Sequence, residues 1–229
     1  MRNTLTILTV LAGVLLTPYA MEASAACSQA VAKVASAQGQ VQVQGYRTNT
    51  WQSIQDNHAL CPGDTLRTSK WSRATLSLSS GSVLTVDQNT TMTFSAPKET
   101  VSSWVINLLE GTTFFRSRQP QRLEVNTPFI NAVHEGTEFL VAVSDQQADI
   151  SVFDGEVSGV NKAGKIKINK GFKGIAEANR GPRLQALKIT PENAVQWALY
   201  YPAIIDDTKA DSGVENHLSP AVTAYRQGD

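Results

Sequence analysis

The sequence predicts an all-β fold, a meandering β-sandwich or β-roll with a short C-terminal helix and a flexible tail. Three observations predict it. Apolar and polar residues alternate with a period of two from Val31 to about Ala178, as in half-buried strands. Glycine and other turn-forming residues interrupt this alternation at short intervals. No segment in this region has a helical stripe of comparable strength.

The strands are expected where the alternation is clearest. In residues 74–87 (ATLSLSSGSVLTVD) most leucines and valines share one face, and most serines and threonines share the other. Five glycines each follow one or more polar residues between two apolar runs, at positions 81, 111, 136, 155 and 171. We expect positive φ at these glycines, in hairpin turns or bulges, and Asp154-Gly155 is the strongest case. Their uneven spacing argues against a strict solenoid.

Residues 1–26 are predicted to be a secretory signal peptide. Arg2 precedes a mostly apolar run from Leu5 to Leu16, and small residues follow at 23–26, so cleavage is expected after Ala25 or Ala26. A membrane-spanning helix needs about 20 apolar residues, and this run is shorter. No transmembrane span is therefore expected after removal of the signal. The alternatives are an uncleaved anchor and a lipidated Cys27.

Cys27 and Cys61 are the only cysteines in the chain. An even count in an exported protein favours a disulfide, which would close a loop of roughly 34 residues and stabilise the fold by about 3–4 kcal/mol. Two free thiols, or a lipidated Cys27 beside a single thiol at Cys61, are the other interpretations.

The character of the chain changes after a β-domain that we assign to residues 27–185. Residues 190–205 (TPENAVQWALYYPAII) predict a short connector helix, because Thr190 suits the N-cap and Pro191 the first helical position. Trp197 and Tyr201 lie one turn apart on it and are candidate partner contacts. Residues 206–229 are polar and are expected to form a flexible tail.

The HEGTE stretch at 134–138 raises the question of a catalytic or metal site, since histidine beside a carboxylate serves both chemistries. A zinc protease helix needs a second histidine four residues on, where this sequence has Glu138. Gly136 and Thr137 also disfavour a helix. We therefore interpret the stretch as a hairpin between two strands, with His134 and Glu135 in a surface turn that is a candidate partner contact.

Composition excludes several function classes. The chain has 20 basic and 20 acidic residues, which gives no electrostatic case for nucleic acid. No nucleophile motif, phosphate-binding loop or metal-ligand set is recognisable, so we expect no enzyme, no catalytic residue, no metal and no cofactor.

Asp64 is expected to hold a turn through its carboxylate. The lysines at 162, 165, 167, 170 and 173 are expected to form a solvated strand face or an edge strand protected by lysines.

Five segments together resemble a FecR-type domain, the β-rich module of periplasmic iron-dicitrate sensors. They are LCPGDTLRT (60–68), RATLSLSSGSVL (73–84), VNTP (125–128), EGTEFLVAV (135–143) and VFDGEV (152–157). The resemblance covers roughly residues 30–180. Residues 194–205 resemble the connector that precedes tetratricopeptide repeats in exported proteins of this kind. Signal-relaying members have a cytoplasmic segment and a membrane span before the β-domain, and the signal peptide predicted here argues against direct control of a sigma factor.

The function expected from these features is that of an exported, non-enzymatic protein-interaction or sensory module in the bacterial envelope, periplasmic or secreted. Its partners are expected to be envelope proteins, bound through edge strands or the C-terminal helix. The alternative is a carbohydrate or peptidoglycan-binding module that stacks sugars on Trp51, Trp71 and Trp104.

Overall fold

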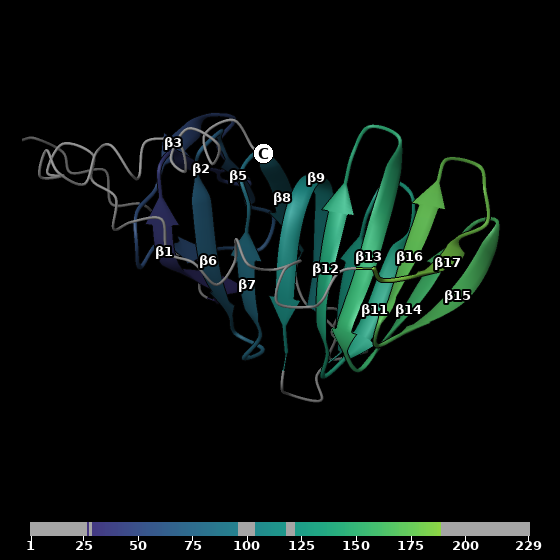
Figure 1. The fold of residues 1–229 in the computed structure, drawn as a ribbon. Helices are drawn as coiled ribbons and strands as arrows, with labels where there is room; N and C mark the ends of the chain where they lie inside the picture. The colour runs from purple at the N-terminus through teal and green to yellow at the C-terminus, as the bar shows by residue number, and fades with distance from the viewer. Residues whose placement is uncertain (1–26, 28, 96–103, 118–121, 189–229) are drawn as a thin grey trace, which may run out of the picture.

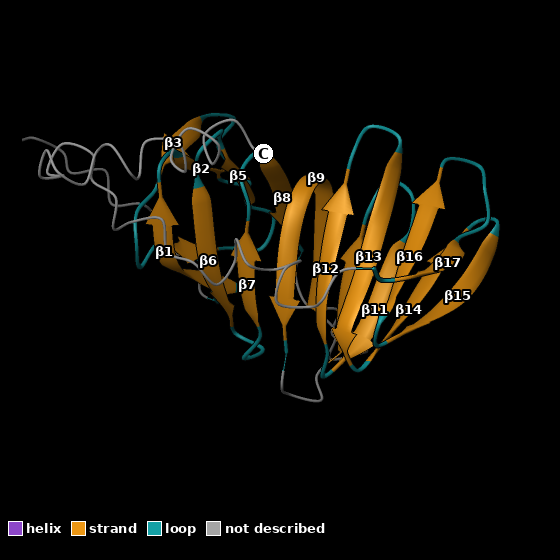
Figure 2. Ribbon diagram, viewed as in Figure 1, coloured by secondary structure: helices purple, strands orange, loops and turns teal. Residues whose placement is uncertain are grey.

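The fold is a sandwich of two β-sheets. The structure, a computed structural model, describes residue 27 and residues 29–95, 104–117 and 122–188. These residues form seventeen strands and no helix, which confirms the predicted all-β class. The two sheets, A and B, enclose a common hydrophobic core (Figures 1 and 2).

Sheet A has the strand order β4–β1–β6–β7–β9–β12–β13–β16–β17, with neighbours antiparallel throughout. Its strands are β1 (Ala32–Gln38), β4 (Ala59–Leu60), β6 (Arg73–Leu78), β7 (Val83–Val86), β9 (Trp104–Arg116), β12 (Glu138–Val143), β13 (Gln147–Asp154), β16 (Phe172–Glu177) and β17 (Arg183–Ala186).

Sheet B has the order β3–β2–β5–β8–β9–β10–β11–β14–β15. Its other strands are β2 (Val41–Gln44), β3 (Trp51–Ser53), β5 (Thr65–Thr68), β8 (Thr90–Phe94), β10 (Arg122–Asn126), β11 (Asn131–Glu135), β14 (Glu156–Asn161) and β15 (Gly164–Asn169). Among the described strands, β9 and β10 are the only parallel neighbours.

Strand β9 belongs to both sheets. Its first half pairs with β8 and β10 in sheet B, and its second half pairs with β7 and β12 in sheet A. The strand bends between the two halves at Gly111, where φ is +90°. One continuous strand therefore ties the two sheets together in the middle of the sandwich, as Figure 1 shows.

The five glycines singled out in the sequence all have positive φ, as predicted; they are Gly81, Gly111, Gly136, Gly155 and Gly171. A hairpin turn is found only at Gly81, and register irregularities of the bulge kind lie beside Gly111 and Gly155. Gly81 turns the β6–β7 hairpin, but the other four stand where the chain passes between sheets A and B. The strands on either side of Asp154-Gly155, for example, pair with other strands and not with each other.

The core follows from the alternation. In β6, the residues Ala74, Leu76 and Leu78 are buried, and the residues between them are more exposed. The largest fully buried side chains include Phe94, Phe115 and Phe139, and the last two stack with ring centroids 4.8 Å apart. Burying each such side chain stabilises the fold by about 1.5–3 kcal/mol, so this apolar face holds the sheets together.

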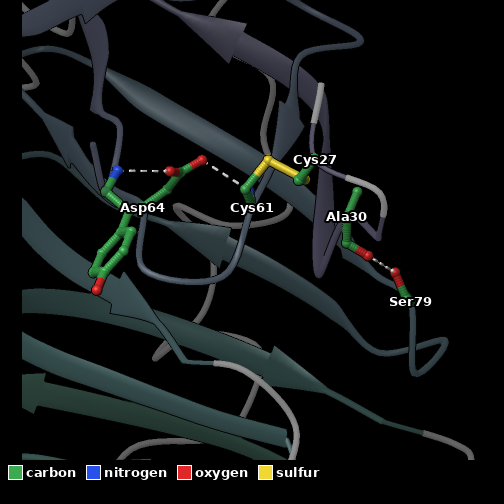
Figure 3. Close-up of a disulfide and its surroundings, with 6 residues drawn as sticks. Cys27, Ala30, Cys61, Asp64 and Ser79 are labelled. Atoms are coloured by element: carbon green, nitrogen blue, oxygen red, sulfur yellow. Dashed lines mark hydrogen bonds between the residues drawn. A yellow bond between two sulfur atoms is a disulfide. The ribbon is translucent and has the colours of Figure 1, made fainter. Parts of the chain in front are cut away.

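A disulfide joins Cys27 to Cys61 and fastens the start of the described chain to the sandwich (Figure 3). Beside it, the Asp64 carboxylate accepts hydrogen bonds from the backbone N–H groups of Cys61 (2.7 Å) and Tyr46 (3.1 Å). The predicted turn-holding role of Asp64 is thus confirmed. Ser79 donates its hydroxyl to the Ala30 carbonyl at 2.7 Å, a second link to the same segment.

We expect peptide mapping of the purified protein without reductant to recover Cys27 and Cys61 in one crosslinked fragment. The reason is the bridge that the structure shows, together with the absence of any other thiol in the chain. Reduction before digestion is the control and should separate the two peptides. Complete alkylation of both cysteines in the unreduced protein would contradict the bridge.

Several predicted segments lie outside the described residues. They are the signal peptide (1–26), the connector helix (190–205) with Trp197 and Tyr201, and the tail (206–229). Their assignments, and the boundary of the β-domain at residue 185, stay predictions.

Candidate functional site

His134 and Glu135 do not form the predicted surface hairpin. They end β11, which pairs with β10 and β14 in sheet B, whereas the following β12 pairs with β9 and β13 in sheet A. HEGT is therefore a corner between the sheets. The His134 side chain is only 2% exposed, so the expectation of a surface histidine available to a partner is wrong.

His134 has a structural environment. Its Nδ1 lies 2.7 Å from the Thr137 hydroxyl, and its ring meets the edge of Phe139 at 4.4 Å between centroids. Its Nε2 is buried without a hydrogen-bond partner among the described residues. Burial lowers the pKa of His134 from 6.5 to about 3, because a charged imidazolium would lack solvent. No group of three or more metal-ligating side chains occurs in the described segments.

The three tryptophans proposed as a sugar platform each have a local partner. The Arg67 guanidinium lies 4.0 Å from the centre of the Trp51 ring, and the Lys70 ammonium lies 4.7 Å from that of Trp71. Trp104 packs against the main core. Each of the three rings therefore has a contact within the protein.

The strongest candidate site is the end of the sandwich formed by β15 and β17, which we call the open end. β15 is the last strand of sheet B and β17 the last strand of sheet A, and Figure 1 shows both at the same end of the molecule. Among the described strands, β15 pairs only with β14 and β17 only with β16, so the outer edge of each has no strand partner. Each edge therefore presents unpaired backbone groups, which other chains recognise readily.

Large apolar side chains are exposed at the open end. Gly174 faces Ile166 and Ile168 of sheet B, so its face of β16 points into the sandwich. Leu184 is its cross-strand partner, and Phe172 lies two residues before it, so both share this inward face. Yet Phe172 is 42% exposed and Leu184 49%, because the sandwich ends there and no further strand covers them.

The open end is also basic. Residues 156–188 contain eight lysines and arginines against two glutamates, although the whole chain is neutral. Ion pairs engage some of the cations, for example Lys167 with Glu156 at 2.7 Å. Lys162, Lys165 and Lys188 form no ion pair with a described residue. Side-chain hydrogen bonds from Arg183 and Arg180 lower the pKa of Glu177, so this carboxylate is charged at neutral pH.

Two turns hold this end together. The side-chain amide of Asn161, in the β14–β15 hairpin, donates to the Arg180 carbonyl in the β16–β17 turn at 2.8 Å. A groove of about 510 Å³ lies beside them and is lined by residues 127–131, 160–163 and 177–180. The open end is therefore a preformed surface with a basic rim.

The sequence indicated only part of this site. The lysine-rich stretch was predicted as a protected edge strand, and β15 confirms that for Lys165 and Lys167. Phe172 and Leu184 were missed. Their alternation marks them as strand residues like any other, and their exposure follows only from the position of β16 and β17 at the end of the strand order.

The predicted resemblance is confirmed by comparison with known protein families. Residues 64–158 match the family described as FecR protein, and four of the five segments quoted above lie wholly within this range. This segment of the chain is therefore similar to the FecR family. The comparison with curated proteins finds no match.

Solved structures share the fold. Two crystal structures of a candidate anti-sigma factor from Parabacteroides distasonis superpose with a TM-score of 0.51 and 16% sequence identity, over 58% of this chain. The match spans 63% and 64% of those chains, so this protein corresponds to less than two thirds of their length. Within the described residues, no helix has the length and apolar character needed to cross a membrane.

Proposed function

We propose that this protein is an exported sensory or regulatory module that acts by binding another protein of the bacterial envelope, and that the open end is its binding surface. The similarity to the FecR family supports the regulatory class, and the similarity to a candidate anti-sigma factor agrees with it. The predicted signal peptide at residues 1–26 and the disulfide support a periplasmic or secreted location. The proposed role is binding rather than catalysis.

The observation that carries the proposal is the exposure of Phe172 and Leu184 beside unpaired strand edges. Two large apolar side chains exposed next to each other on adjacent strands form an apolar patch, and such patches are typical of protein-interaction surfaces. Covering the exposed half of each side chain in an interface would contribute roughly 1 kcal/mol, so the two residues are expected to be among the apolar contacts.

A photo-crosslinking residue placed at Phe172 in living cells should capture an envelope protein. The matched control is the same residue at Tyr46, which is 78% exposed and follows β2 (Val41–Gln44). Figure 1 shows β2 at the opposite end of the molecule from β15 and β17. Mass spectrometry would identify the captured protein, and the N-terminal peptide of the mature chain, beginning at Ala26 or Cys27, would report export. Equal capture from both positions would contradict the proposed surface. Sedimentation with purified cell-wall sacculi, without protein capture, would favour the glycan-binding alternative.

A further inference from the structure

The two strand edges at the open end differ in how well they are protected. On β15, Lys165 and Lys167 are exposed, and lysines on an edge strand discourage another strand from pairing with it. β17 (RLQA) has no lysine and is exposed along its whole length. If a strand adds to this end, the less protected edge is that of β17.

The backbone of β17 has the right direction for such pairing. Leu187, just beyond the strand, donates its N–H to the Gly171 carbonyl at 2.9 Å, on the β16 side. Backbone groups of successive residues in an antiparallel strand point to alternate sides. The N–H and C=O groups of Leu184 and Ala186 therefore point away from β16, toward the free edge.

The side chains of the same two residues form the apolar half of the surface. Leu184 and Ala186 pair with Gly174 and Phe172, respectively, so all lie on the inward face of sheet A. A strand added beside β17 would extend this face and cover Phe172 and Leu184 with every second side chain. An incoming segment with alternating apolar residues fits this requirement.

Charge decides which partner fits. The net charge of residues 156–188 is strongly positive. Lys162, Lys165 and Lys188 have no ion-pair partner among the described residues. A second copy of this chain would bring two such ends together, and like charges facing each other at an interface cost several kcal/mol. A negatively charged segment gains from the same field.

We propose that β17 is a receptor strand, to which a partner adds an extended segment whose apolar residues alternate with acidic ones. The added strand bonds to the outward backbone groups of Leu184 and Ala186 and covers Leu184 and Phe172. Its acidic side chains lie on the outer face of sheet A, on the same side as Arg183 of β17, within the positive field of residues 156–188. This inference rests on the proposed function, since it names the binding mode and the chemistry of the partner at the same surface.

The test uses a short synthetic peptide in which valine alternates with glutamate, and a second peptide in which lysine replaces glutamate. Calorimetry measures the affinity, and NMR locates the perturbed residues. Ala186→Pro removes one outward N–H, which an edge strand tolerates on its free side. We expect the glutamate peptide to bind at β16 and β17, and Ala186→Pro to weaken it about tenfold or more. Ala186→Ser keeps the N–H and should bind like the original chain.

Three results would overturn the inference: no binding of the glutamate peptide, equal binding of the lysine peptide, or binding that Ala186→Pro leaves unchanged. Self-association that Ala186→Pro abolishes would assign the edge to a second copy instead. The melting temperature of each variant shows whether it has folded. If Phe172 still captures its cellular partner in the Ala186→Pro chain, strand addition fails but the proposed function stands. If Phe172 captures nothing in the unaltered chain, the proposed function itself fails, whatever the peptides do.

Discussion

Gly111→Val is expected to destabilise the protein by more than about 4 kcal/mol, enough to unfold much of it given a typical total stability of about 5–15 kcal/mol. Gly111 has φ of +90°, a conformation that a β-branched residue resists. A Cβ atom there would also press against the Cα and Oγ1 atoms of Thr90 and lie 2.6 Å from the Asn89 carbonyl oxygen.

Thr90 cannot move aside to make room. It is fully buried, its N–H bonds to the Thr68 hydroxyl at 3.1 Å, and its own hydroxyl accepts the Thr112 N–H at 3.0 Å. These bonds fasten β8 to β5 and to β9 where β9 passes from one sheet to the other. Loss of this corner would separate the two sheets, and so the effect should be global. The measurement is denaturant unfolding followed by circular dichroism.

Gly171→Ala is the matched control for Gly111→Ala. Gly171 has a similar φ of +84°, but a Cβ added there meets nothing within 4 Å. The control should therefore show the conformational cost alone, about 1–2 kcal/mol. Gly111→Ala should exceed it clearly, because the collision with Thr90 is added. If the two alanine variants lose equal stability, the packing argument at Gly111 is wrong.

These glycines also show how much of the local structure can be predicted from the sequence. Polar–glycine steps between apolar runs were enough to predict positive φ at Gly111 and Gly155. They could not tell a hairpin from a corner between sheets, because both need the same local backbone. The difference lies in which distant strand each neighbour pairs with. β13 pairs with β16 and β14 with β11, and these contacts leave no mark in a window of a few residues.

Dependence on distant strand pairing also explains why only part of the candidate site could be predicted from the sequence. The lysines of β15 suggested an edge strand because their exposure can be predicted from composition. The exposure of Phe172 and Leu184 depends on strand order, which period-two alternation does not encode. At His134 the alternation in fact favoured burial, since Ala132 and His134 lie on the same side of β11 and both are buried. The prediction gave more weight to the turn signal of Gly136 than to this alternation, and the predicted exposure of His134 was therefore wrong.

His134→Ala is expected to cost about 2–4 kcal/mol, unlike a substitution at a surface turn, which would stay within about 0.5 kcal/mol. The variant leaves a cavity beside the Phe139 ring and removes the partner of the Thr137 hydroxyl. Thermal and denaturant unfolding at neutral pH measure the loss. A change too small to detect would mean that the histidine is not packed in the core.

The pH dependence gives a sharper test, because burial lowers the pKa of His134 from 6.5 to about 3. Between these values the unfolded chain binds a proton on His134 that the folded chain excludes. The free energy of unfolding therefore falls as the pH falls below about 6.5, at up to about 1.4 kcal/mol per pH unit, and this contribution is complete above that pH. From pH 7.5 to pH 5 it amounts to about 2 kcal/mol.

His134→Gln is the matched variant, since glutamine has a polar side chain that does not titrate. We expect it to be less stable than the original chain at pH 7.5, with a loss of stability toward pH 5 that is smaller by about 2 kcal/mol. The difference between the two curves isolates His134, because all other titrating groups are shared. Parallel curves over this range would show that His134 takes up its proton equally in both states, which would contradict its burial beside Phe139.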